Sequence, residues 1–360
     1  MYVETYAKKL DAKYILNIND TQYNVQKALI DVNFRVSPDD KLRSDLDTFP
    51  RQQTISHAID RHTLEIIGEC NANNTEYQAH LNHITASGAG SWLHAVPSKA
   101  LRTHVDPLLF RTMIQRWLRA PIHESEFHCP FCDEIVDKYG DHCLTCACGG
   151  DRTKRHNLIR NEVFHFCNSS GLNPELERPG LLQSRPLAGA MQENGAHRDP
   201  NLNRCPADIY LLKWRRGTPA ALDFVVTSGL RPSIVSRSAE DGTAAVKDYE
   251  NFKLSHLDTE AICQEQGINF IPVICEADGG GWGPAGHKVW SQLAKHKSVI
   301  TGESSSIIVT RLLQSLGLIL YRENARSILR RYPSSTSQAC SELLAASAAC
   351  LTTGGINQPG

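Results

Sequence analysis

The chain has 360 residues and a formal net charge of −1 at pH 7, and 41% of its residues are hydrophobic and 21% charged. This composition is typical of globular proteins and excludes collagen-like, mucin-like and wholly disordered chains. Because acidic and basic residues balance, no global field draws the chain to nucleic acid, and any such binding must come from local basic patches.

No segment of the sequence suits a membrane or export. The longest apolar stretch, residues 306–321, is interrupted by Arg311 and Gln314, whereas a membrane span needs about 20 apolar residues. Residues 1–5 include an acid and are not followed by the apolar core of a secretory signal. We therefore expect a soluble intracellular protein with no membrane partner, whose 12 Cys are thiols or metal ligands and not a disulfide framework.

Helical patterns fill the first third of the chain. Helices are predicted over residues 20–31, 52–70, 75–85 and 107–119, and the second carries isoleucine and leucine at roughly helical spacing. A Gly/Ser turn and a proline within residues 86–97 separate the third helix from the fourth.

The pattern changes after a segment rich in Cys and His at residues 128–150. A predicted helix at 154–166 is followed by short apolar strands at 207–213, 220–227 and 268–275, with a helical span over 239–266 between the last two. Residues 187–203 are predicted to form a surface loop, helix returns at residue 304, and the tail after residue 334 is expected to fray.

The predicted fold class is therefore mixed. It combines an N-terminal all-α region over residues 1–120, a small metal module over 121–150, an α/β core over 151–300, and C-terminal helices with a flexible tail over 301–360.

A zinc site is predicted between residues 129 and 146. Cys129, Cys132, His142 and Cys146 follow the spacing C-x2-C-x9-H-x3-C, which can complete a tetrahedral Zn²⁺ site of the closed, structural kind. Cys143 and Cys148 are alternative ligands, and the simpler explanation is that these cysteines pack as small hydrophobic residues.

A basic run follows the metal module. Five side chains that can contact phosphate lie within ten residues: Arg152, Lys154, Arg155, His156 and Arg160. The alternative is a solvated charged helix face, but the neighbouring zinc module favours nucleic acid.

Two acids are placed to share a cation. Asp208 begins the first strand of the core and Asp223 lies in the middle of the next, with fourteen residues between them. On a hairpin the two can face each other, and Asp223 sits among apolar neighbours where an unpaired charge is costly. A shared divalent cation such as Mg²⁺ could activate water for phosphodiester hydrolysis; the commoner explanation for such an acid is a cap on a turn.

Together these motifs resemble a known family. A C-x2-C…Gly-Asp-His-x3-C knuckle, an Arg-His-Asn helix start, a Pro-Ala-Asp strand and a Leu-Asp-Phe-Val-Val strand are similar to the C-terminal part of reverse transcriptase-like proteins of non-LTR retroelements. In these proteins a restriction-like endonuclease of the PD-(D/E)XK class follows the zinc knuckle. The resemblance covers about residues 92–290.

The resemblance implies roles for individual residues. Asp208 and Asp223 match the Mg²⁺ ligands, and either Glu162 or Glu177 could be an additional acid near the metal. Val225 stands where the motif has Lys, so the Lys is expected from the following helix as Lys253 or, second, Lys247. Tyr249 lies four residues before Lys253 and would share its helix face.

The implied function is a retroelement-derived, Mg²⁺-dependent endonuclease that nicks target DNA, with structural Zn²⁺, a nuclear location, and element RNA as a further partner. No polymerase activity is expected, because the paired-Asp turn of a reverse transcriptase is absent from the sequence. Two alternatives stay open. One is a catalytically decayed remnant that binds nucleic acid, and the other is a zinc-stabilised helical adaptor.

Overall fold

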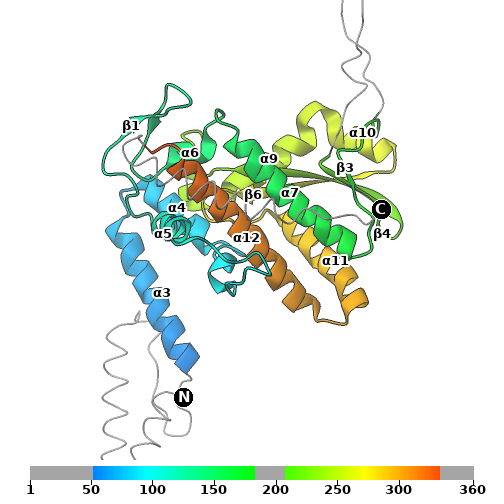
Figure 1. Cartoon of the computed structure of the whole chain (residues 1–360), viewed down its shortest axis with the longest axis horizontal. Helices are drawn as coiled ribbons and strands as arrows, with labels where there is room; N and C mark the ends of the chain where they lie inside the picture. The colour runs from blue at the N-terminus through cyan, green and yellow to red at the C-terminus, as the bar shows by residue number, and fades with distance from the viewer. Residues whose placement is uncertain (1–51, 183–206, 333–360) are drawn as a thin grey trace, which may run out of the picture. The chain divides into compact units, whose positions relative to one another are not determined.

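The computed structural model describes residues 52–182 and 207–332 and has a mixed α/β architecture (Figure 1). It divides into two units, residues 1–74 and the compact unit from Thr75 onward. In the first unit, α3 (Gln52–Cys70) confirms the helix predicted over residues 52–70. The predicted helix at 20–31, the loop at 187–203 and the tail after 334 lie outside the described residues.

The compact unit is built on a four-stranded mixed sheet. Its strands follow the order β3 (Glu175–Leu176), β4 (Ile209–Arg215), β5 (Thr218–Thr227) and β6 (Asn269–Glu276). The first two pairings are antiparallel and the last is parallel. The two residues between β4 and β5, Arg216 and Gly217, both have positive φ, as a tight hairpin turn of this kind requires.

Helices connect the parallel pair β5 and β6, because parallel neighbours need a crossover. The crossover consists of α8 (Val235–Glu240), α9 (Ala244–Ser255), η3 (His256–Asp258) and α10 (Thr259–Glu265). The helical span predicted over residues 239–266 is thus formed by several short helices. Leu257 and Asp258 have φ of 56° and 53°, and this left-handed step ends α9 before α10 begins.

The sheet is covered on both faces (Figure 1). On one face, apolar side chains of α7 (Asp151–Ser169), α11 (Pro284–Thr301) and α12 (Ser305–Leu329) share a core with Leu222 and Phe224 of β5. On the other face, Ala221 packs with residues of α9 and α10. Successive β5 side chains therefore alternate between the two layers, as the two-residue repeat of a strand dictates.

The elements before the sheet pack on the same core. They are α4 (Thr75–Thr85), η2 (Ser91–His94), α5 (Pro107–Trp117), and a small knuckle of β1 (Phe127–His128), β2 (Ile135–Val136) and α6 (Asp141–Thr145). Trp92 stacks on Tyr321 of α12 with ring centroids 4.7 Å apart. The compact unit that begins at Thr75 contains all of these elements, and the functional boundaries at residues 120, 150 and 300 stay a prediction.

Within residues 52–182 and 207–332, no single helix has the length and apolar character of a membrane span; α11 and α12, bent by 119° at their junction, meet that test only when taken together.

Candidate functional site

Two carboxylates meet at one end of the β4–β5 hairpin. Ile209 pairs with Leu222, so the preceding Asp208 lies opposite Asp223, the arrangement that the sequence predicted. The backbone N–H of Asp208 donates to Leu222 O at 2.9 Å, and an Asp208 carboxylate oxygen accepts the N–H of Phe224 at 2.6 Å. Asp208 is therefore held by the strand that carries Asp223.

Asp223 is a buried acid with a cationic neighbour. Its side chain is 15% exposed, and Lys253 Nζ of α9 lies 2.9 Å from its Oδ2. Burial, reinforced by the charge of Asp208, raises the pKa of Asp223, while Lys253 acts in the opposite direction. Lys247 instead pairs with the exposed Asp241 at 2.9 Å. The structure thus brings Lys253, and not Lys247, to the carboxylates.

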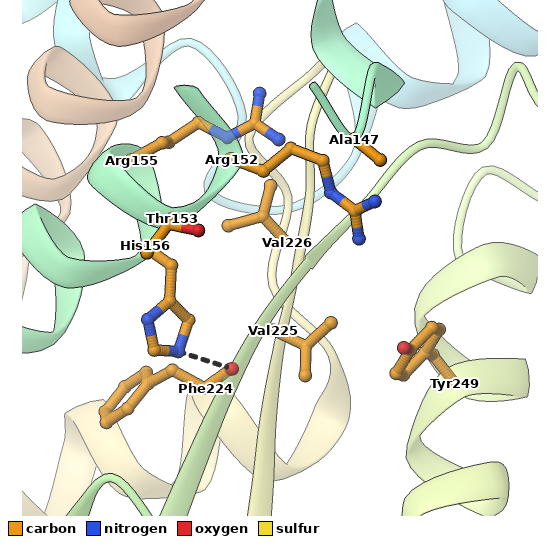
Figure 2. A pocket seen from close by; sticks show the side chains of 9 residues that line it. All are labelled: Ala147, Arg152, Thr153, Arg155, His156, Phe224, Val225, Val226 and Tyr249. Atoms are coloured by element: carbon orange, nitrogen blue, oxygen red, sulfur yellow. Dashed lines mark hydrogen bonds between the residues drawn. The ribbon is translucent and has the colours of Figure 1, made fainter. Parts of the chain in front are cut away.

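His156 of α7 belongs to the same group. Its Nε2 lies 3.0 Å from Phe224 O (Figure 2) and 3.2 Å from Asp208 Oδ2. Its hydrogen bond to Asp208 raises the pKa of His156. The sequence placed His156 only among the phosphate-binding residues. The sequence signal was the helical spacing: Arg152 and Arg160 lie four residues before and after His156, so the three side chains share one face of α7.

The two candidate additional acids lie in different places. Glu177, with φ of 44°, donates its backbone N–H to Asp208 O at 3.0 Å, and its carboxylate forms an ion pair with Arg160. Glu162 accepts a hydrogen bond from Ser315 Oγ of α12 at 2.6 Å. Six residues of helix turn Glu162 well away from the face of His156, so the structure places Glu177, and not Glu162, beside Asp208.

The residues of the basic run differ in exposure. Arg152 is exposed and Lys154 is 38% exposed, with Glu323 4.0 Å from its Nζ. Arg155 is 4% exposed and donates to Asn324 Oδ1 at 2.6 Å and to Leu144 O at 2.9 Å. These partners hold its guanidinium between α7, α12 and the knuckle, while the Arg155 side chain also contributes to the lining of the pocket described below. Its contact with nucleic acid stays a prediction.

The knuckle gathers the four predicted metal ligands, Cys129, Cys132, His142 and Cys146, within 4.8 Å of one another. We call these four the Cys/His cluster. The two Sγ atoms of Cys132 and Cys146 are 3.6 Å apart, close to the roughly 3.8 Å between two thiolates that each lie 2.3 Å from a tetrahedral zinc. The cluster therefore fits a metal such as zinc. Cys143 is buried against the core and Cys148 is exposed.

A buried ion cluster fixes the knuckle to α7 and α12. Asp151, the first residue of α7, accepts hydrogen bonds from Arg326, Arg330 and Arg331 near the end of α12. We call these four residues the Asp151 cluster. The Arg330 and Arg331 guanidiniums also lie 5.1 and 5.0 Å from the ring centroid of Phe131 in the knuckle. The sequence gave no sign of these distant partners of Asp151.

A pocket of about 380 Å³ opens next to the carboxylates (Figure 2). Two of its lining residues, His156 and Phe224, also contact Asp208, so the pocket adjoins the pair of acids. The lining residues come from the knuckle, α7, β5 and α9: Ala147, Arg152, Thr153, Arg155, His156, Phe224, Val225, Val226 and Tyr249.

Neither a family model nor a curated protein sequence matches this chain. The site is interpreted from its own residues.

Proposed function

We propose that this chain is a metal-dependent endonuclease with a restriction-like core, which hydrolyses phosphodiester bonds of DNA. The observation that carries the proposal is the convergence of two carboxylates and a lysine. Asp208 and Asp223 lie opposite each other on one hairpin, and Lys253 Nζ is 2.9 Å from Asp223. The resemblance to the nuclease of non-LTR retroelements gives these residues the same roles.

Asp208 and Asp223 would hold Mg²⁺, because hard divalent cations prefer carboxylate oxygens. Burial and the charge of Asp208 raise the pKa of the Asp223 carboxyl. This supports the proposal, because a cation held between the two acids would favour the charged form of Asp223. When bound, Mg²⁺ would lower the pKa of a water and neutralise charge on the phosphate.

The protein's own groups would supply the rest of the chemistry. Lys253 orients the attacking water or stabilises the developing negative charge on the phosphate, where its ammonium acts in a site partly screened from solvent. The hydrogen bonds of Asp208 to His156 and to the Phe224 N–H hold that carboxylate toward Asp223. Glu177, tied to the Asp208 backbone, is the additional acid that this geometry favours.

The Cys/His cluster would hold structural Zn²⁺ and fix the start of α7, since four protein ligands leave no open position for catalysis. Arg152 and Lys154 would then contact DNA phosphates beside the cleavage site. A role in nicking target DNA for a retroelement, with element RNA as a further partner and a nuclear location, follows from the resemblance.

The test is nicking of supercoiled plasmid by the zinc-loaded chain with Mg²⁺, Mn²⁺ or EDTA. We expect nicking with either cation, none with EDTA, and loss of nicking in Asp223→Asn. Asp248→Asn is the matched control, because Asp248 lies on α9 in an exposed ion pair with Arg237. Equal cleavage by Asp223→Asn and the parent would refute the proposal, and a folded parent that binds DNA without cutting it would indicate a binding remnant.

A further inference from the structure

Side chains of β5 and α9 lie near one another at two successive positions. Asp223 and Lys253 form an ion pair, and two residues farther along β5 Val225 lines a pocket that Tyr249 of α9 also lines. A step of two residues along a strand covers about 6.7 Å, and four residues along a helix cover about 6 Å. The pocket therefore begins one step beyond the carboxylates along β5.

The walls of this pocket differ in chemistry. Arg152 and His156 project from α7, and Tyr249 projects from α9 on the other side of β5 (Figure 2). Val225 and Val226 of β5 add apolar side chains to the lining between these two helices. A guanidinium suits a phosphate, whereas an aromatic ring and an apolar surface suit the face of a nucleobase. The three together match a nucleotide.

The size of the pocket sets the number of nucleotides. About 380 Å³ is near the lower end of the range for small-ligand sites, roughly 300–1,000 Å³. Such a volume accommodates a single nucleotide but not a stacked base pair. The base that enters must therefore be unpaired, or be turned out of the duplex.

We propose that the pocket seats an unpaired nucleotide next to the scissile phosphate, with its base on Tyr249 and its phosphate at Arg152. This inference rests on the proposed nuclease function, because the step from Asp223 to Val225 is what places the nucleotide beside the bond to be cut. DNA that is single-stranded or distorted at the cut is then preferred to intact duplex.

The test is photocrosslinking of the full chain to a single-stranded oligonucleotide of about 12 nucleotides that carries 5-iodouracil, which couples to a stacked aromatic ring on irradiation. The reaction is run without Mg²⁺, so that it does not depend on cleavage. Trypsin would release Tyr249 in the peptide that follows Lys247 and ends at Lys253, and mass spectrometry assigns the crosslinked residue. Binding is measured in parallel by fluorescence anisotropy.

We expect a crosslink at Tyr249 that Tyr249→Phe keeps and Tyr249→Leu loses, because leucine fills the space against Val225 but has no aromatic face. Stacking of one base predicts an affinity loss in Tyr249→Leu between about 5-fold and about 150-fold. Arg152→Gln should lower both affinity and its salt dependence, and Arg215→Gln, at an exposed position on β4, is its charge-matched control.

The outcomes separate this inference from the nuclease proposal. Bound oligonucleotide whose crosslinks map only to other residues, or an unchanged affinity in Tyr249→Leu, would overturn the nucleotide pocket even if the plasmid is cut. A crosslink at Tyr249 in a chain that cuts no DNA would support the pocket and refute the nuclease. Absence of any oligonucleotide binding would overturn the pocket.

Discussion

Replacement of Asp151 by Asn should destabilise the fold strongly, because it removes the carboxylate that the three arginines of the Asp151 cluster share. Arg326 keeps its ion pair with Glu323. Asp151 is 4% exposed, and Arg331, which donates to it at 2.8 Å, is 0% exposed. Breaking a buried ion pair from one side costs about 3–5 kcal/mol, since the remaining charge stays buried. The side chain of Arg330 is 31% exposed, so solvent weakens its interaction with Asp151. The amide oxygen of Asn can still accept one hydrogen bond from the arginines. We expect a loss of about 3 kcal/mol.

Thermal unfolding followed by circular dichroism at saturating zinc measures this loss. For a unit of this size 1 kcal/mol shifts Tm by about 2–4 °C, so Asp151→Asn should lower Tm by about 6–12 °C. Asp248→Asn breaks a pair with Arg237 in which both side chains are at least half exposed, and its cost should stay below about 1 kcal/mol. Equal Tm shifts in the two variants would show that the Asp151 cluster does not anchor α7.

Three further predictions concern the metal ligands, the lysine and a buried histidine. Zinc analysis should find one ion per chain in the parent and in Cys148→Ser, and none in Cys146→Ser; retention in Cys146→Ser would contradict the ligand set. Lys253→Met should lower the nicking rate about 10²–10³-fold while Lys247→Met leaves it unchanged, and equal rates would remove Lys253 from the site. Burial lowers the pKa of His83, but the Glu276 and Asp278 carboxylates raise it above 6.5 overall. The folded state then binds the proton more tightly, so this stabilisation is complete below pH 6.5 and is lost as pH rises through the folded pKa. Tm should therefore fall as pH rises above about 6.5, more steeply in the parent than in His83→Gln at saturating zinc, and parallel profiles would refute the assignment.

Local patterns in the sequence were enough to place the catalytic candidates. The apolar runs around Asp208 and Asp223 predicted β4 and β5, and a hairpin between them brings the two acids together whatever packs outside it. The spacing of Cys129, Cys132, His142 and Cys146 likewise selects the four residues that the structure gathers. Both inferences depend on residues that are close in sequence.

Long-range packing was not predictable in this way. Arg155 looked like any other member of the basic run, but its partner Asn324 is 169 residues away. Gly242, between α8 and α9, lies against α4, where an added Cβ would come 2.4 Å from Asn82 O. Such contacts leave no periodic signal in the sequence, since each depends on a segment that is distant along the chain.

The residues around Val225 depend on both local sequence patterns and long-range packing. The resemblance implied that the following helix supplies the lysine that Val225 replaces, and it ranked Lys253 before Lys247. The structure adds the register of α9 against β5, in which Lys253 pairs with Asp223. The same register places Tyr249 in the pocket beside Val225, a position that the sequence suggested only as a shared helix face.

The most direct test of the central claim is the Mn²⁺ dependence of plasmid nicking by the parent and by the Asp208→Asn, Asp223→Asn double variant, at equal zinc content and equal DNA affinity. We predict a saturable rise in nicking rate with Mn²⁺ in the parent and no cation-dependent nicking in the double variant. Cation-dependent nicking at the parental rate in the double variant would contradict the assignment of the cleavage site to these two carboxylates.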